Sequence, residues 1–365
     1  MAMVWFSGCE DMPKRIFDES ITSNTVPTSP GRTGDCTYIG GSTNRVRKNL
    51  PSQHQTLIIG WAGGTFLSSG TIVGAGSMNG ASFYNHFSIT YSFTSGAFGI
   101  YKGIGNYYGT RELIVEIPYY ILGSSSAPGI WHQYEVKVTY GAEDDPSAPG
   151  AIELRVDKQV VYSNNNIDIF NSDGSALPYF DAVAWYGGSC SFFLDDIYVC
   201  DDTGDSCNDF LGYCRIYPVQ PTGDGFYPTN PSVDEWSPST GSDRYAVVDD
   251  LVDRVNNYDT YNNYIESAGV GDKATFTFDV SGNISKTLIG PVGFVSMIHN
   301  DDGLQKRLKG LVRYDGTDNN DASFLIDDTV YKSDLFVYED NPTNSQAWTK
   351  TMLDNTEFGI EDSTV

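Results

Sequence analysis

The stretch "HQYEVKVTYG", residues 132–141, decides the fold class, because its apolar and polar side chains alternate. Tyr134, Val136 and Val138 take every second position, and Glu135 and other polar residues stand between them. Successive side chains of a β-strand point to opposite faces of a sheet, so this alternation is typical of a half-buried antiparallel strand. The stretch therefore predicts a sheet with one face in a hydrophobic core.

The residues that follow repeat the pattern and predict a long hairpin. In "AIELRVDKQVVYS", residues 151–163, Ile152, Leu154 and Val156 alternate with polar residues, after the polar turn cluster of residues 141–150. We expect further strands in residues 55–67, 87–103, 111–122, 180–188, 191–199, 272–280, 287–300, 306–316, 322–331 and 334–340. Many short strands separated by turn signals favour a sandwich or jelly roll, so we expect an all-β chain of jelly-roll-like β-sandwiches.

Helix signals are scarce in this chain. In "YAVVDDLVDRVNNY", residues 245–258, Val248, Leu251 and Val252 recur at helical steps, but residues 244–250 can equally form a strand before an acidic loop. We prefer the strand and loop, because Asn, Asp and Tyr dominate the residues that follow.

The composition excludes several classes of partner. The 365 residues carry a net charge of −25, whereas a protein that binds DNA or RNA needs a basic surface, so we expect no nucleic-acid partner. No apolar run approaches the roughly 20 residues of a membrane helix, so we expect no membrane insertion. The first residues, "MAMVWFSGCEDMPK", lack the basic leader and apolar core of a signal peptide, so we expect synthesis in a cytoplasm without secretion by the usual route.

The charge is uneven along the chain and predicts a domain boundary near residue 200. Residues 1–200 hold 18 acidic and 11 basic side chains, and the remaining residues hold 29 acidic and 11 basic ones. A stretch rich in Pro, Gly and Ser, residues 219–244, lies just beyond the change. We therefore divide the chain into a first β-sandwich (1–200), an interdomain joint with an irregular linker (201–240) and a second β-sandwich (241–365).

Six cysteines raise the question of a metal site or of disulfides. Zinc sites usually pair ligands two to four residues apart, and the region from Cys190 to Cys214 has neither a CxxC spacing nor a histidine, which argues against a metal. Disulfides that staple the joint and buried thiols both stay open. The disulfide candidates are Cys9, Cys36, Cys190, Cys200, Cys207 and Cys214.

Two glutamates in a predicted strand raise the alternative of a glycoside hydrolase. In "ELIVE", Glu112, Ile114 and Glu116 fall on one face of a strand, and retaining hydrolases need two carboxyls roughly 5 Å apart. Concanavalin-A-like hydrolases resemble E-x-D-x-E at such a strand, and here Ile114 replaces the middle aspartate. The chain also has no GxSxG elbow. We expect no catalytic residue, with a carbohydrate-binding or hydrolytic module that uses Glu112 and Glu116 as the alternative.

Acidic loops and tryptophans supply the remaining binding candidates. Calcium takes six to eight oxygens, but neither acidic loop matches an EF-hand, so we expect no cofactor, with calcium as the alternative. The calcium candidates are Asp201, Asp202, Asp205, Asp315, Asp318 and Asp321. Trp236 lies in the polar linker and is the candidate for stacking on a sugar, whereas core packing is expected for Trp61, Trp131, Trp185 and Trp348.

The order of several short motifs resembles a class of tailed-bacteriophage virion proteins with a LamG or concanavalin-A-like first domain. In the first half the resemblance includes "VWFSGCED", "GRTGDC", "RVDKQV" and "LDDIYVCDDTG". It continues through "CNDFLGYCRIYPVQPTGDG", "YIESAGVGDKATFTF" and "NPTNSQAWTKTMLDNTEFGIE". Two departures from the class, Cys9 and Cys36, are both to cysteine, and the resemblance suggests a disulfide between them across neighbouring strands.

The resemblance implies a non-enzymatic structural protein on the surface of a virion. Such a protein serves as a tail fibre, a tail-tip appendage or a capsid decoration, and we place the tail slightly ahead of the capsid. It would self-associate as a homo-oligomer and dock on other virion proteins. Its surface loops would contact a glycan of the host surface.

Overall fold

The computed structural model describes most of the chain. The described residues are 2–9, 17–21, 26–28, 32, 36–39, 45–64, 69–92, 95–103, 111–118, 131–141, 148–169, 177–187, 192–227, 236–248, 263–280, 290–298, 305–326 and 332–363. They form two compact units, Met1–Ile216 and Tyr217–Val365, and each is described by itself. The chain is all-β, as its sequence predicts, and among the described residues no helix is long and apolar enough to cross a membrane.

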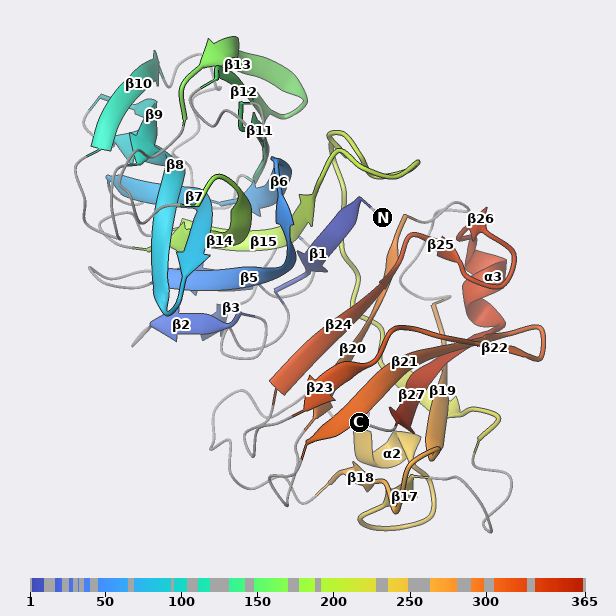
Figure 1. The fold of residues 1–365 in the computed structure, drawn as a ribbon. Helices are drawn as coiled ribbons and strands as arrows, with labels where there is room; N and C mark the ends of the chain where they lie inside the picture. Colours follow the sequence, from blue (N-terminus) through green and yellow to red (C-terminus); the bar gives the residue numbers. More distant parts are fainter. Residues whose placement is uncertain are drawn as a thin grey trace. The chain divides into compact units, whose positions relative to one another are not determined.

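The first unit contains two antiparallel sheets, coloured blue to green in Figure 1. One sheet has the order β13-β12-β11-β6-β15-β4-β3, with β1 also paired to β15. Its strands are β1 (Met3–Ser7), β3 (Val26–Thr28), β4 (Cys36–Ile39), β6 (Thr56–Gly63), β11 (His132–Thr139), β12 (Gly150–Val156), β13 (Gln159–Ile167) and β15 (Phe192–Cys200). The other sheet has the order β10-β9-β8-β7-β14-β5-β2. Its strands are β2 (Glu19–Ile21), β5 (Arg45–His54), β7 (Gly70–Asn79), β8 (Ser82–Ser92), β9 (Ala97–Gly103), β10 (Arg111–Pro118) and β14 (Phe180–Tyr186).

The predicted hairpin is confirmed, and its apolar residues face the other sheet. Val136 of β11 lies opposite Leu154 of β12, as the alternation requires. The ring of Tyr134 on β11 lies 5.9 Å from the ring of Phe98 on β9, measured between centroids, so the two sheets share one core. These contacts between sheets define a β-sandwich.

The segment after β15 packs onto the first unit. Residues 201–216 belong to this unit, and the boundary between the units falls after Ile216, inside the range that we assigned to the joint. The backbone N–H of Gly212 donates to the buried Glu135 carboxylate at 2.6 Å, and the N–H of Ile216 donates to Asp196 at 2.8 Å. Two carboxylates of the sheet therefore hold the segment in place.

The second unit, yellow to red in Figure 1, contains a larger sheet and a strand pair that packs on it. The larger sheet has the order β16-β19-β27-β21-β22, with β23 on β21, and β20 pairs with β24. The strands are β16 (Pro221–Asp224), β19 (Lys273–Phe278), β20 (Val292–Ile298), β21 (Lys306–Tyr314), β22 (Thr317–Asn320), β23 (Phe324–Ile326), β24 (Lys332–Tyr338) and β27 (Thr356–Ser363). Short pairs join β17 (Ser237–Pro238) to β18 (Ile265–Glu266) and β25 (Asp340–Asn341) to β26 (Gln346–Ala347).

A hydrophobic cluster joins the two layers of the second unit. Phe336 and Tyr338 of β24 pack with Val312 of β21 and Phe358 of β27 around the fully buried Trp348. The helix α3 (Lys350–Asp354) follows this tryptophan. This cluster makes the second unit a sandwich with layers of unequal size.

The preference for a strand at residues 244–250 is wrong where the structure describes it. Residues Tyr245–Val248 form one helical turn, α2. The Asp224 carboxylate accepts hydrogen bonds from the N–H groups of Arg244 (3.1 Å) and Tyr245 (2.7 Å), which are otherwise unsatisfied at a helix start. A partner distant in sequence therefore stabilises the turn.

Candidate functional site

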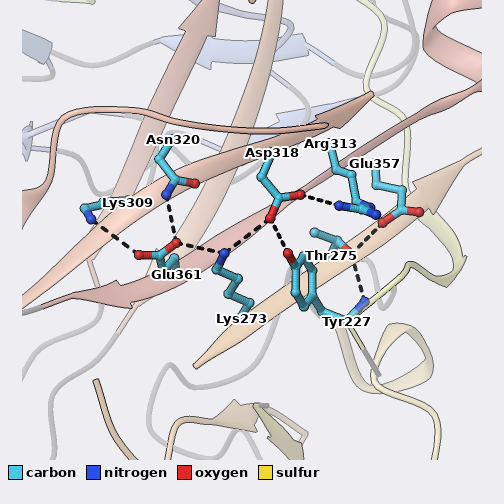
Figure 2. A network of polar contacts seen from close by, with 9 residues as sticks. All are labelled: Tyr227, Lys273, Thr275, Lys309, Arg313, Asp318, Asn320, Glu357 and Glu361. Atoms are coloured by element: carbon cyan, nitrogen blue, oxygen red, sulfur yellow. Dashed lines mark hydrogen bonds and ion pairs between the residues drawn. The ribbon is translucent and has the colours of Figure 1, made fainter. Parts of the chain in front are cut away.

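The larger sheet of the second unit has an apolar face and a polar face. On β19, Phe276 points to the core, whereas Lys273 and Thr275 point to the other side. On β27, Phe358 points to the core and Glu357 points to the other side. Figure 2 shows that nine side chains from β19, β21, β22, β27 and the turn after β16 meet on this polar face. They are Tyr227, Lys273, Thr275, Lys309, Arg313, Asp318, Asn320, Glu357 and Glu361, which we call the polar-face network.

Asp318 is the hub of the polar-face network. Its carboxylate accepts hydrogen bonds from Arg313 Nη1 at 2.5 Å, from Lys273 Nζ at 3.2 Å and from the hydroxyl of Tyr227. Burial alone would raise the pKa of Asp318, but the hydrogen bonds from Tyr227, Arg313 and Lys273 outweigh burial and lower it. Asp318 is therefore ionised at neutral pH.

Lys273 links Asp318 to a second carboxylate. Its Nζ lies 3.5 Å from Glu361 Oε2, and Lys309 Nζ lies 3.3 Å from Glu361 Oε1. Asn320 Nδ2 also donates to Glu361, at 2.8 Å. Burial lowers the pKa of Lys273, but hydrogen bonding to Asp318 and the nearby charges raise it overall, so its ammonium group stays charged.

A third carboxylate fixes the turn after β16. Glu357 Oε2 accepts hydrogen bonds from the Thr275 hydroxyl and from the backbone N–H of Phe226, both at 2.7 Å. A Cβ atom at Gly225 would lie only 2.5 Å from Glu357 Oε2, so the turn needs a glycine here. Glu357 thereby holds the aromatic residues 226 and 227 at the edge of the network.

These two aromatic residues form the apolar part of the site. The ring of Phe226 is 50% exposed and lies edge-on to Tyr227, with centroids 5.2 Å apart. The Arg313 guanidinium carbon lies 3.9 Å from the centroid of the Phe226 ring, a cation–π contact that orients the ring. The site thus combines an exposed aromatic ring with charged hydrogen-bond donors and acceptors. These charged side chains hold one another in position through the ion pairs and hydrogen bonds of the network.

The predicted glycan contact, Trp236, lies elsewhere in this unit. Its indole N–H donates to the carbonyl oxygen of Asp272 at 3.1 Å, and its ring packs against a core cluster that contains Phe276. Trp61, Trp185 and Trp348 are fully buried, as core packing predicts. Sequence reasoning missed Phe226, although "DGFYP" places two neighbouring aromatics in a polar segment.

The calcium candidates do not share one site. Asp201 accepts from His54 and Thr203, and Asp318 is the hub described above. Asp315 lies in the hairpin turn between β21 and β22. Within the described ranges, no group of three or more His, Cys, Asp or Glu side chains could hold a metal ion. The functions proposed below therefore use no metal.

The carboxylate pair of the hydrolase alternative does not share a face. Glu112 lies opposite Lys102 and Glu116 lies opposite Gly99, with an irregularity between Leu113 and Val115. Residues three apart on β9 point to opposite faces, so their partners Glu112 and Glu116 do so as well. The expectation that they lie on one face is therefore wrong, because a bulge changes the phase of β10.

Five of the six cysteines are described, and all five are thiols in the structure; Cys190 lies outside the described residues. Cys9 and Cys36 are buried. Cys9 lies two residues after β1 and Cys36 is the first residue of β4, and both strands pair with β15. Burial, with Asp195 nearby, raises the pKa of the Cys9 thiol. Burial also raises the pKa of Cys214, to about 12. A disulfide between Cys9 and Cys36 stays a prediction.

No protein-family model matches the chain, and no curated protein matches it. Among solved structures it is similar to the alginate lyase Aly36B, with a TM-score of 0.37 and 9% identity over 55% of this chain and 93% of that chain. It is also similar to a marine PL-14 alginate lyase from Aplysia kurodai, with a TM-score of 0.37 and 11% identity over 55% of this chain and 99% of that chain. A third similar structure is the carbohydrate-binding module CBM66 from Bacillus subtilis, with a TM-score of 0.32 and 10% identity over 50% of this chain and 94% of that chain. These low TM-scores carry no argument about substrates, and they do not test the resemblance to virion proteins.

The expectation that the chain is not an enzyme needs correction. Similar β-sandwich structures include alginate lyases, so the fold gives no reason to exclude catalysis. We therefore do not retain that expectation.

Proposed function

We propose that the chain is a carbohydrate-binding protein and that the polar face of the second unit, with Phe226 at its edge, binds a glycan. The half-exposed ring of Phe226, fixed by Arg313 beside hydrogen-bonding side chains, is the observation that carries the proposal. A sugar ring has an apolar face that stacks on an aromatic ring and a rim of hydroxyls that need fixed donors and acceptors. Binding sites for small molecules combine these same two elements.

The ligand class that fits is a neutral glycan. The chain carries a net charge of −25, and in the network three basic side chains are already paired with carboxylates. A polyuronate such as alginate would meet electrostatic repulsion from the acidic surface, with no cation left unpaired in the network to offset it. A neutral polysaccharide avoids this cost.

The test is an array of neutral and anionic glycans probed with the full chain, followed by calorimetry on any ligand found. Phe226→Ala should weaken binding about tenfold, which corresponds to a loss of about 1.4 kcal/mol. Tyr264→Ala is the matched control, because Tyr264 is a 42% exposed aromatic of the same unit outside the network. Absence of any glycan ligand, or equal losses in both variants, would overturn the proposal.

We also propose the surface of a virion as the setting, with other virion proteins and further copies of the chain as partners. The order of the sequence motifs is what supports this setting. Mass spectrometry of purified particles is the test. A few to some tens of copies would indicate the tail, hundreds would indicate the capsid, and absence from the particle would refute the setting.

A further inference from the structure

Three polar side chains of the first unit form a hydrogen-bonded relay away from the polar-face network. Ser52 Oγ lies 3.0 Å from His54 Nε2, and His54 Nδ1 lies 3.0 Å from Asp201 Oδ2. Ser52 and His54 are two residues apart at the end of β5, where the pairing with β14 is irregular. Asp201 follows the last residue of β15.

The acidic end of the relay is fixed by its own hydrogen bonds. Asp201 Oδ1 accepts from the N–H of Thr203 at 2.9 Å and from its hydroxyl at 2.6 Å. The backbone N–H of Asp201 donates to the carbonyl of Ala2 at 2.8 Å, which ties this residue to the start of β1. The carboxylate therefore presents its second oxygen, Oδ2, to His54 in a defined direction.

These contacts determine which imidazole nitrogen carries the proton. An ionised carboxylate can only accept, so His54 Nδ1 carries the hydrogen that is donated to Asp201. The lone pair of Nε2 then points to the Ser52 hydroxyl, which donates to it. His54 and Asp201 are buried at 8% and 7% exposure, whereas Ser52 is exposed and within reach of a solute.

We infer that Ser52, His54 and Asp201 form a nucleophilic site that hydrolyses carboxylic esters. A nucleophile, a base that takes its proton and a third group that orients the base are the geometric signature of such sites, whatever the fold or the order in sequence. The site is independent of the proposed glycan-binding face, because the two share no residue and lie in different units.

The reaction balances with an ester and water as the only reactants. Ser52 Oγ bonds to the carbonyl carbon while its proton passes to His54 Nε2, and that proton then leaves on the departing alcohol as the ester bond breaks. Water attacks the resulting acyl-serine and gives its proton to His54. The acid is released, and the proton returns to Ser52 Oγ.

Esters are the substrate class that an exposed serine suits best. An alkoxide leaves more readily than an amine, so ester cleavage demands less stabilisation of the transition state than amide cleavage. Proton transfer by a positioned base contributes typically 10²–10⁴-fold to such a reaction.

The experiment treats the full chain with a fluorophosphonate probe and maps the labelled peptide by mass spectrometry. Release of p-nitrophenol from its acetate ester is measured in parallel. We expect labelling of Ser52, and we expect Ser52→Ala to reduce ester turnover to the rate in buffer alone. Asp201→Asn should slow labelling about 100-fold, because its amide nitrogen would face the Nδ1–H and favour the wrong tautomer.

The chain contains two matched controls. Ser163→Ala removes another exposed serine of a strand and should leave labelling and turnover unchanged. His132→Gln disrupts a second His–Asp pair, in which His132 Nδ1 lies 2.6 Å from Asp157 and the described residues offer Nε2 no hydrogen-bond partner. The inference would be overturned if Ser52 were labelled no faster than Ser163, or if ester turnover survived in Ser52→Ala. Either result would mean that the hydrogen bond between Ser52 and His54 is merely structural.

Discussion

Arg313 and Asp318 face each other across the β21–β22 hairpin, with Nη1 and Oδ1 2.5 Å apart and both side chains mostly buried. The pair forms where Arg313 and Asp318 are direct cross-strand neighbours. The same arginine orients Phe226 and the same aspartate accepts from Tyr227, so one ion pair supports both aromatic residues of the polar-face network.

Asp318→Asn should destabilise the second unit by roughly 1 to 2 kcal/mol, because three charge-assisted hydrogen bonds lose their ionised acceptor. The pKa of Asp318 in the folded chain lies below its ordinary value. The contribution of Asp318 to the free energy of unfolding is therefore complete above the pKa of the unfolded chain, about 3.9, and it is lost as the pH falls through the pKa of the folded chain. Hydrogen exchange of β21 and β22 between pH 5 and 2 measures this. An acid transition of the same size in Asp318→Asn would contradict it.

His86 gives the first unit an acid sensitivity of different origin. Burial lowers its pKa to about 3, so between pH 3 and about 6.5 the unfolded chain binds a proton that the folded chain does not. Stability should therefore fall with decreasing pH in this window, by about 1 kcal/mol per pH unit. Denaturant unfolding at pH 7 and 4.5 would test this, with His86→Gln expected to reduce the dependence.

Tyr198→Phe should destabilise the first unit by about 2 to 3 kcal/mol. The Tyr198 hydroxyl donates to the buried Glu135 and accepts from the N–H of Leu211 at 3.1 Å, so its removal leaves both groups short of a partner. Urea denaturation would measure the loss. Tyr162→Phe is the control, because Tyr162 is a half-buried residue of the same sheet whose hydroxyl accepts from the neighbouring Asn164 side chain at 3.2 Å.

Gly359→Ala should destabilise the second unit by at least about 2 kcal/mol, because the added methyl group would overpack the sheet. A Cβ atom at Gly359 would lie 1.8 Å from the carbonyl oxygen of Ala274, and backbone cannot move aside as a side chain can. Gly290→Ala is the control, because a Cβ atom at Gly290 would meet no described atom within 4 Å. Comparing the thermal unfolding of the two variants separates the effect of steric crowding from the effect of replacing a glycine.

The sequence predicts the strands well where large apolar residues alternate, as in β11 and β12. It misses β7, because "GTIVGAGSMN" has small residues where the alternation would otherwise be visible. It misplaces Glu112 and Glu116, because a bulge in β10 has no marker among the residue types there.

The candidate sites depend on contacts that sequence reasoning does not supply. The spacing of Ser52 and His54 is visible in the sequence, but Asp201 lies 147 residues further along. It follows a strand of the other sheet, so it meets His54 only because the two sheets pack together in the sandwich. Phe226 is visible as an aromatic in a polar segment, but its support by Arg313 comes from another strand.

The packing of residues 201–216 on the first unit bears on where the chain can be divided for laboratory use. A fragment that stopped at the end of β15 would keep every strand of the first sandwich but lose the N–H groups that Gly212 and Ile216 give to Glu135 and Asp196. Two buried carboxylates would then lose donors in a medium of low polarity. The smallest self-sufficient piece of this half of the molecule therefore ends at Ile216, sixteen residues beyond its last strand.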